Sequence, residues 1–287
     1  ATGAERALVG IEDNKPEAIA AMRQAAAPHA AVKICPVPAR YPMGSDRQLI
    51  VELTGREVPA DARAADAKAL VHNVGTAYAA QQAVCEGKPL VSRLMTLNGG
   101  AVAAPGNYEV PLGMLVSDLI AGAGGYRAEV ARLIMGGPMM GFELPGLEAP
   151  VVKASNCLIA GSPALFPPLP PEMRCIRCGA CAEACPHELQ PFELYWFSRA
   201  KNFRKTQEYH IFDCIECGCC SFVCPSRIPL VQYFRFAKSE IWAREREKTA
   251  ADQAKERFEF KQFREEREKA EKAEKLAKAA AAQAAKK

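Results

Sequence analysis

Eight of the 12 cysteines in this 287-residue sequence lie in two copies of one spacing. Each copy reads Cys-x2-Cys-x2-Cys-x3-Cys-Pro, from Cys175 to Pro186 and again from Cys214 to Pro225. Three thiolates at positions i, i+3 and i+6 of a tight loop can bind three corners of one iron–sulfur cube. In proteins with two such cubes, the fourth cysteine of each run ligates the other one. The spacing therefore predicts two [4Fe-4S] clusters. The predicted ligands are Cys175, Cys178, Cys181 and Cys224 for cluster 1, and Cys214, Cys217, Cys220 and Cys185 for cluster 2.

Two other uses of cysteine compete with this interpretation. A structural zinc site takes four ligands, usually as pairs from separate knuckles, and a disulfide framework requires an oxidising compartment and usually a small secreted domain. Two consecutive triples, each followed by Cys-Pro, match neither pattern. Cys219 stands beside Cys220, but only Cys220 preserves the spacing, so Cys219 is expected to be a small buried side chain. Burial is also the expectation for Cys35, Cys85 and Cys157.

The composition excludes several classes of function. A formal net charge of +4 is too small to argue for nucleic acid binding. No apolar run approaches the ~18 residues of a membrane-spanning helix, and no secretory signal is visible. Thiolates that bind clusters fit a reducing compartment, which means the cytoplasmic side. The sequence starts at Ala1 rather than Met, which suggests a fragment.

Residues 1–88 alternate short apolar runs with helical stretches, which favours an α/β layer with a mainly parallel sheet. Pro16 occupies a favoured first helical position, Ser45 to Gln48 has the form of a capping box, and Gly87 is typical of a helix end. The predicted strands are 7–11, 32–35 and 70–71, and the predicted helices are 16–26, 45–53 and 73–84.

Residues 89–150 have the pattern of a small α+β domain, with a hairpin turn at Asn98-Gly99-Gly100. The predicted strands are 90–97, 108–112 and 133–135, with a helix over 114–121. The loop from Gly136 to Gly141 lacks the Lys-Ser/Thr of a phosphate loop and does not open a helix. Its two methionines are therefore interpreted as packing residues.

The composition divides the C-terminal half of the chain into a linker, a cluster domain and a tail. A Pro-rich linker over 151–172 precedes the cluster domain, 173–235, where apolar spacing predicts a helix over 189–204. The tail, 236–287, is rich in Ala, Glu, Lys and Arg and is expected to be a solvated helix that frays after Leu276. Several basic residues near the cluster loops either compensate anionic clusters, dock an acidic partner or form an ordinary solvated face. They are Arg174, Arg177, Arg204, Lys205 and Arg227.

Seven short segments, most of them outside the cysteine runs, carry a family resemblance. They are Gly10–Pro16, Tyr41–Gly44, Gln48–Ile50, Leu53–Pro59, Asn73–Ala77, Met135–Gly141 and Cys178–Cys181. Together they resemble the C subunit of the Rnf (Rsx) electron transport complex, over nearly all of residues 5–250. So many matches in the same order make the resemblance specific.

The resemblance implies a peripheral electron-input subunit on the cytoplasmic face of the bacterial inner membrane. The complex in that family exchanges electrons between NADH and ferredoxin while it moves an ion across the membrane. The implied partners are the A, B, D, E and G subunits, with membrane attachment only through them. The implied fold is an α/β layer similar to the flavoprotein subunit of respiratory complex I, then a small β-grasp domain. A helical two-cluster ferredoxin domain and a charged C-terminal helix complete it.

The same resemblance implies that FMN and NADH bind the full-length protein. In that family a glycine-rich flavin and nicotinamide segment precedes the point where this sequence starts, so the chain is expected to be an N-terminally truncated copy. Asn73 and Thr76 match positions near the flavin in the complex I relative, although a helix N-terminus held by its own cap also explains them. Two adjacent glutamates of that relative are replaced here by Ser45 and Asp46.

Three hypotheses for function follow. The first is an electron-transfer subunit of an ion-translocating oxidoreductase, in which this chain is mainly an electron carrier with no catalytic residue assigned. The second is a subunit of a soluble NAD-dependent flavin/iron–sulfur dehydrogenase. The third is a zinc-stabilised adaptor with a helical tail, which predicts a colourless protein. Cubanes instead predict a brown protein with broad absorption near ~400 nm.

Overall fold

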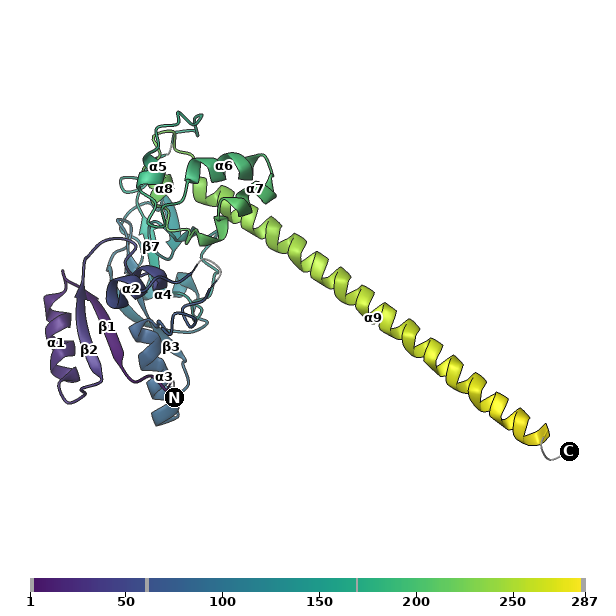
Figure 1. Ribbon diagram of the computed structural model, residues 1–287. Helices are drawn as coiled ribbons and strands as arrows, with labels where there is room; N and C mark the ends of the chain where they lie inside the picture. The colour runs from purple at the N-terminus through teal and green to yellow at the C-terminus, as the bar shows by residue number, and fades with distance from the viewer. Residues whose placement is uncertain (1–2, 60–61, 169, 285–287) are drawn as a thin grey trace.

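The computed structural model describes residues 3–59, 62–168 and 170–284. The first residue, Ala1, and Leu169 of the Pro-rich segment therefore lie outside the described residues. The chain forms an N-terminal α/β layer, a five-stranded sheet, a helical domain that holds the paired cysteine runs, and one long terminal helix (Figure 1).

The N-terminal layer is built on two parallel strands. Strands β1 (Ala7–Glu12) and β2 (Val32–Val37) pair in parallel, and they are joined by helix α1 (Pro16–Ala26). Helices α2 (Asp46–Thr54) and α3 (Val74–Glu86) follow. Gly10 lets α2 lie close to β1, because a Cβ at this position would stand 2.8 Å from the Leu49 Cδ1 atom.

Three details of this layer differ from the sequence expectations. Leu70 and Val71 form no strand, and β2 continues through Pro36 to Val37. Ser45 precedes α2 but its hydroxyl makes no capping hydrogen bond, so the expected capping box does not form. The helices over 16–26 and 73–84 are confirmed, and Gly87 ends α3 in the left-handed conformation.

The five-stranded sheet has the order β4-β3-β7-β5-β6. Its strands are β3 (Ser92–Asn98), β4 (Gly106–Pro111), β5 (Arg132–Met135), β6 (Phe142–Glu143) and β7 (Cys157–Gly161). Helix α4 (Val116–Gly122) covers one face and shares a buried core with Leu97 and Leu158. Gly99, at φ +112°, is required here because a Cβ would overlap the Ala160 carbonyl.

Strand β7 lies inside the segment 151–172 that the composition marks as a linker. It pairs in parallel with β3 and antiparallel with β5, so it is the central strand of the sheet. Residues 157–161 therefore belong to the sheet and not to a linker, and β5 is not the last strand. The Pro-rich part of the segment begins after Gly161.

The helical domain contains five short helices and the start of the long one. They are α5 (Ala180–Glu183), α6 (Pro191–Arg199), α7 (Phe203–Glu208), the 3-10 helix η1 (Ile211–Asp213), α8 (Cys219–Phe222) and α9 (Leu230–Ala284). The helix expected over 189–204 is interrupted after Arg199. Lys201 adopts φ +54°, and the Asn202 side chain caps α7 by accepting a hydrogen bond from the Lys205 N–H.

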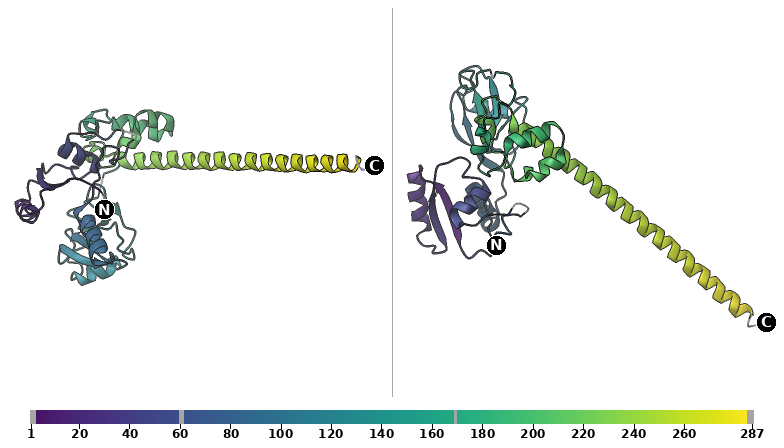
Figure 2. Two further views of the ribbon diagram at one scale, coloured as in Figure 1. Left: turned by 60° about the horizontal axis from the view of Figure 1, so that its bottom comes forward. Right: turned by 45° about the horizontal axis from the view of Figure 1, so that its top comes forward.

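Helix α9 packs on α6 through its first turns and then leaves the body of the molecule (Figure 2). Phe234, Ala237 and Ile241 are buried, whereas the described side chains beyond Glu245 are exposed. The helix continues to Ala284 instead of fraying after Leu276. Ion pairs such as Lys261–Glu265 and Arg264–Glu268 link successive turns of its exposed part. Across the described ranges, no helix is both long enough and apolar enough to cross a bilayer.

Candidate iron–sulfur centres

The two cysteine runs fold into two copies of one local structure. In each run the third residue of the loop, Arg177 or Glu216, adopts a positive φ of 56° or 58°. This conformation turns its backbone N–H toward the first cysteine of the run, with N–Sγ distances of 3.4 Å to Cys175 and 3.4 Å to Cys214. Gly179 and Gly218, both left-handed, then start the short helices α5 and α8. The backbone thus donates hydrogen bonds to sulfur, one of the features that tunes cluster potentials.

Eight thiols are gathered into two cavities in the crossed arrangement. The cavity called cage 1 is lined by Cys175, Cys178, Cys181 and Cys224, and the cavity called cage 2 by Cys185, Cys214, Cys217 and Cys220. Helices α6 and α9 each contribute side chains to both cages. Tyr195 and Leu230 line cage 1, whereas Leu194 and Phe234 line cage 2. Each run therefore gives its first three cysteines to one cage and its fourth to the other.

The donor set of the cages fits iron–sulfur clusters. Burial raises the pKa of the Cys220 thiol to about 12, and it also raises the pKa of Cys181 and Cys214. Such thiols keep their protons in a metal-free cage, and a coordinated metal displaces those protons. Among the described residues, no three Cys, His, Asp or Glu side chains converge as one metal ion requires. Four thiols around one apolar hollow match the ligand number of one [4Fe-4S] cube.

The remaining cysteines lie outside the eight-thiol set. Cys219 is partly exposed rather than buried, and the thiols of Cys35 and Cys157 are partly exposed as well. Cys85 is exposed, so its expected burial is wrong. It occupies the last turn of α3, a helix that buries none of its residues.

Cage 2 carries a buried ion pair that the sequence analysis missed. The Lys238 ammonium, on α9, donates to the Cys214 carbonyl oxygen at 2.7 Å and to Glu216 Oε1 at 2.9 Å. The Lys238 side chain is only 7% exposed. Arg235 binds the other carboxylate oxygen of Glu216 at 2.7 Å. Burial raises the pKa of Glu216, but the hydrogen bonds from Arg235 and Lys238 outweigh it and hold this pKa below the usual value.

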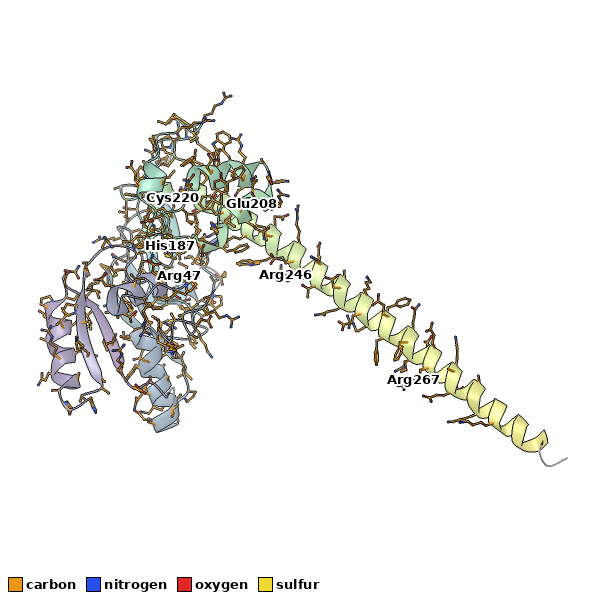
Figure 3. The ribbon with its side chains drawn as sticks, in the orientation of Figure 1. Arg47, His187, Glu208, Cys220, Arg246 and Arg267 are labelled. Atoms are coloured by element: carbon orange, nitrogen blue, oxygen red, sulfur yellow. The ribbon has the colours of Figure 1, made fainter. Side chains whose placement is uncertain are left out.

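The N-terminal layer contacts the polypeptide around cage 2. The Tyr41 hydroxyl donates to the Cys217 carbonyl oxygen at 2.5 Å, and Gln48 Nε2 lies 2.9 Å from His187 Nε2. Figure 3 shows Cys220, His187 and Arg47 following one another from the helical domain toward α2. Burial, then the proximity of Cys217 and Cys219, raises the pKa of Tyr41 to about 12, so the phenol keeps its proton and can donate.

A second polar contact joins the same two regions. Arg47 Nη1 lies 3.7 Å from Asp213 Oδ1, and both side chains are mostly buried. Burial, and next the Arg47 guanidinium, lowers the pKa of His187 below its usual value, so the ring is neutral at neutral pH. A neutral imidazole with its proton on Nδ1 accepts a hydrogen bond at Nε2 from the Gln48 amide N–H. These contacts hold the start of α2 beside the run that follows Cys185.

Removal of the Tyr41 hydroxyl is expected to loosen this contact. In the variant Tyr41→Phe the Cys217 carbonyl loses its donor, at a cost of about 1 kcal/mol. Local opening then rises about fivefold. Hydrogen exchange measured by mass spectrometry should show faster exchange over residues 40–45 and 214–218. Tyr126→Phe, in the sheet domain, is the matched control. Equal exchange in Tyr41→Phe and the parent chain contradicts the assigned role.

The glycine-rich loop after β5 also approaches cage 2. A Cβ on Gly218 would stand 2.9 Å from the Met139 carbonyl oxygen, so the sheet domain packs directly on the second cysteine loop. A Cβ on Gly141 would stand 2.5 Å from the Gly137 carbonyl oxygen and 2.6 Å from Ile134 Cγ2, so the two ends of the loop pack against each other. The loop from Gly136 to Gly141 therefore packs against the cysteine loop of cage 2.

The two residues suggested as flavin neighbours lie at the exposed N-terminus of α3. The Asn73 side chain accepts a hydrogen bond from the Gly75 N–H at 2.9 Å, so it caps its own helix. Thr76 is exposed, and neither residue lines one of the two cages. The structure thus brings the eight cysteines together in two sets, while Asn73 and Thr76 stand apart from them.

Comparison with known proteins divides the chain into the same regions. Three family models match: the Nuo51 FMN-binding domain over residues 1–82, the SLBB domain over residues 95–143 and the 4Fe-4S dicluster domain over residues 174–228. The chain is thus a mixed α/β protein with an iron–sulfur domain and a long C-terminal helix.

Curated relatives are named as the C subunit of the ion-translocating oxidoreductase complex. The protein of Pectobacterium carotovorum is 48% identical over 258 residues, which cover 90% of this chain and 34% of the relative. The protein of Pseudomonas aeruginosa is 49% identical over 258 residues, which cover 90% of this chain and 33% of the relative. The chain thus spans about a third of the length of these relatives.

One solved structure is similar in part. It is the crystal structure of an NAD+-reducing [NiFe]-hydrogenase in the H2-reduced state, with 19% sequence identity and a TM-score of 0.48. The match covers 80% of this chain and 47% of that chain.

Proposed function

We propose that this chain transfers single electrons within an ion-translocating oxidoreductase complex, because over nine-tenths of its length it is a homologue of the C subunit of such complexes. The observation that carries the proposal is the pair of cages, each lined by four thiols drawn from both cysteine runs. When bound there, two [4Fe-4S] clusters supply one-electron carriers. The ligand sets are those of the crossed assignment: Cys175, Cys178, Cys181 and Cys224 around cluster 1, and Cys214, Cys217, Cys220 and Cys185 around cluster 2.

Contacts of the N-terminal layer indicate which of the two cages receives electrons first. Tyr41 and the start of α2 contact the chain around cage 2, and the matching FMN-binding family model covers residues 1–82. The input side of the chain is therefore the cage 2 side. Apolar residues of α6 and α9 line both cages.

The finer features of the proposal rest on the family. The whole protein exchanges electrons between NADH and ferredoxin, binds FMN with Asn73 and Thr76 near the flavin, and assembles with the A, B, D, E and G subunits. It lies at the cytoplasmic face of the bacterial inner membrane and is held there by those subunits. The five-stranded sheet is a β-grasp domain, since a hairpin, a helix and a central strand parallel to the first strand occur in that order. The proposed domains are 1–88, 89–161 (extended from 150 to include β7), 173–235 and 236–287.

Native fractionation with metal analysis tests the proposal. Membranes of the host should carry the protein and release it on an alkaline or urea wash. The chain reconstituted without oxygen should hold about eight iron atoms and absorb near ~400 nm. A protein that stays in the soluble fraction and reduces a dye with NADH unaided is instead part of a soluble flavin/iron–sulfur dehydrogenase. A colourless protein that holds zinc overturns both.

A further inference from the structure

The two cysteine loops have the same backbone conformation, but their third residues carry opposite charges. Their third residues, Arg177 and Glu216, share the left-handed conformation and the N–H to sulfur contact. Glu216 is neutralised from within by Lys238 and Arg235. Arg177 is exposed, and the structure shows no ion pair for it among the described residues. The charge on the loop of cage 2 is thus compensated within its own domain, whereas the loop of cage 1 presents a positive charge to solvent.

The rest of the cage 1 surface extends this difference. The Met173 N–H donates to the Ser226 carbonyl oxygen at 2.9 Å, and the Ser226 hydroxyl donates to the Arg174 carbonyl oxygen at 2.9 Å. These bonds hold the segment before Cys175 beside the turn after Cys224, so Arg174 and Arg227 lie on neighbouring segments. Both arginines are exposed and, within the described part of the chain, form no ion pair.

Exposed apolar side chains lie among these arginines. Ile176 is 67% exposed and Met173 is 57% exposed, and Cys178 of cage 1 is itself exposed. The nearest acid in the chain before the loop, Glu172, is contacted by the hydroxyls of Tyr195 and Tyr233. Residues 173–182 and 224–228 contain no acidic residue, and the next acid along the chain is the exposed Glu183 at the end of α5. The surface formed by Met173, Arg174, Ile176, Arg177 and Arg227 is called the cage 1 face below.

We propose that the cage 1 face docks an acidic electron-transfer protein or domain, so that cage 1 is the output side of the chain. The inference rests on the proposed function. Unpaired guanidinium groups bind carboxylates in a planar, bidentate manner, and Met and Arg are enriched at protein interfaces. Short-lived electron-transfer contacts are small, which suits five residues around one exposed loop. Three arginines are too few for a lipid surface, where clusters of four to eight are typical.

Stopped-flow mixing of the reduced chain with two carriers of opposite charge tests the docking. The probes are the acidic soluble domain of cytochrome b5 and basic cytochrome c. Each transfer oxidises one reduced cluster by one electron and reduces one ferric haem, which is read from the haem absorbance. The test variant is Arg174→Gln with Arg177→Asn and Arg227→Asn, because Asn tolerates the positive φ of 56° and 53° at the last two positions.

The triple variant is expected to reduce cytochrome b5 about tenfold more slowly at low salt, with a weaker dependence on ionic strength. Reduction of cytochrome c should not slow. A matched control with the same loss of charge is Arg23→Gln, Arg56→Gln and Arg246→Gln, all exposed and away from the cages. It should keep the parent rate. The variant Arg174→Lys with Arg177→Lys and Arg227→Lys should restore the rate only in part, since the charge returns but the bidentate guanidinium geometry does not.

Binding of oxidised cytochrome b5 to the oxidised chain gives a second readout that involves no electron transfer. The triple variant should bind it about tenfold more weakly than the control variant does. Equal rates and equal binding in the triple variant and the parent overturn the docking proposal. The face binds lipid instead if the parent chain sediments with vesicles that contain ~30% phosphatidylserine and the triple variant does not, while both carriers react with the variant as with the parent. That result overturns the docking proposal. A chain that takes up no reducible cluster refutes the proposed function instead, and the binding measurement still tests the face.

Discussion

The variant Cys185→Ser is expected to lose cluster 2 and keep cluster 1, although Cys185 belongs to the first cysteine run. Cys185 lines cage 2 with three thiols of the second run. Loss of one thiolate leaves that cube with three protein ligands. Iron content should fall from about eight atoms per chain to about four. Iron analysis and electron paramagnetic resonance of the reduced protein measure the loss.

Double variants decide whether the ligands are crossed. Cys185→Ser combined with Cys214→Ser removes two ligands of one cage, so it should lose no more iron than Cys185→Ser alone. Cys185→Ser combined with Cys178→Ser removes one ligand from each cage, so both clusters should be lost. An uncrossed arrangement reverses these two outcomes. Cys219→Ser is the control, and it should retain about eight iron atoms.

The cages could be anticipated from the sequence because their geometry is local. A cube of fixed size dictates the spacing of its first three ligands, and the same spacing then recurs 39 residues later, at Cys214. Helices α1 and α3 were anticipated for the same kind of reason. Pro16 and Gly87 act on the backbone at the ends of their own helices.

Strand β7 could not be anticipated in this way. Its five residues form one short apolar run, and no alternating pattern marks it as a strand. Its partner β3 lies about 60 residues earlier in the chain, and only the assembled sheet leaves a central gap for it. The contacts of Tyr41 and His187 are of the same kind, because each joins segments more than 100 residues apart.

Lys238 did leave a signal in the sequence. Val231, Phe234 and Ile241 are buried on one face of α9. Lys238 falls on the same face, seven residues after Val231 and three before Ile241. A single lysine within an apolar helical stripe indicates a buried partner, because a charge is rarely buried unpaired. The charged composition of the following tail hid this signal, since a solvated helix was expected there.

The variant Lys238→Ala is expected to destabilise the cage 2 region by ~3 kcal/mol, because removal of one partner leaves the Glu216 charge and the Cys214 carbonyl poorly satisfied. Arg235 stays bonded to the other Glu216 oxygen at 2.7 Å, but its side chain is 43% exposed, so water screens this pair more than the Lys238 pair. Bleaching of the ~400 nm absorption in urea with an iron chelator measures the effect. If the ion pair is lost before the rate-limiting step, ~3 kcal/mol corresponds to a bleaching rate about 100-fold higher.

The control for this prediction acts on the same carboxylate from the exposed side. Arg235→Gln removes the same charge from Glu216 and should cost less than about 1 kcal/mol. Lys238→Met combined with Glu216→Gln removes both charges of the pair and keeps similar side-chain volumes, so it should recover most of the lost stability. Equal bleaching in Lys238→Ala and Arg235→Gln contradicts a buried ion pair. Because Lys238 contacts the loop of cage 2, cluster 2 should bleach first in Lys238→Ala while the resonance signal of cluster 1 persists.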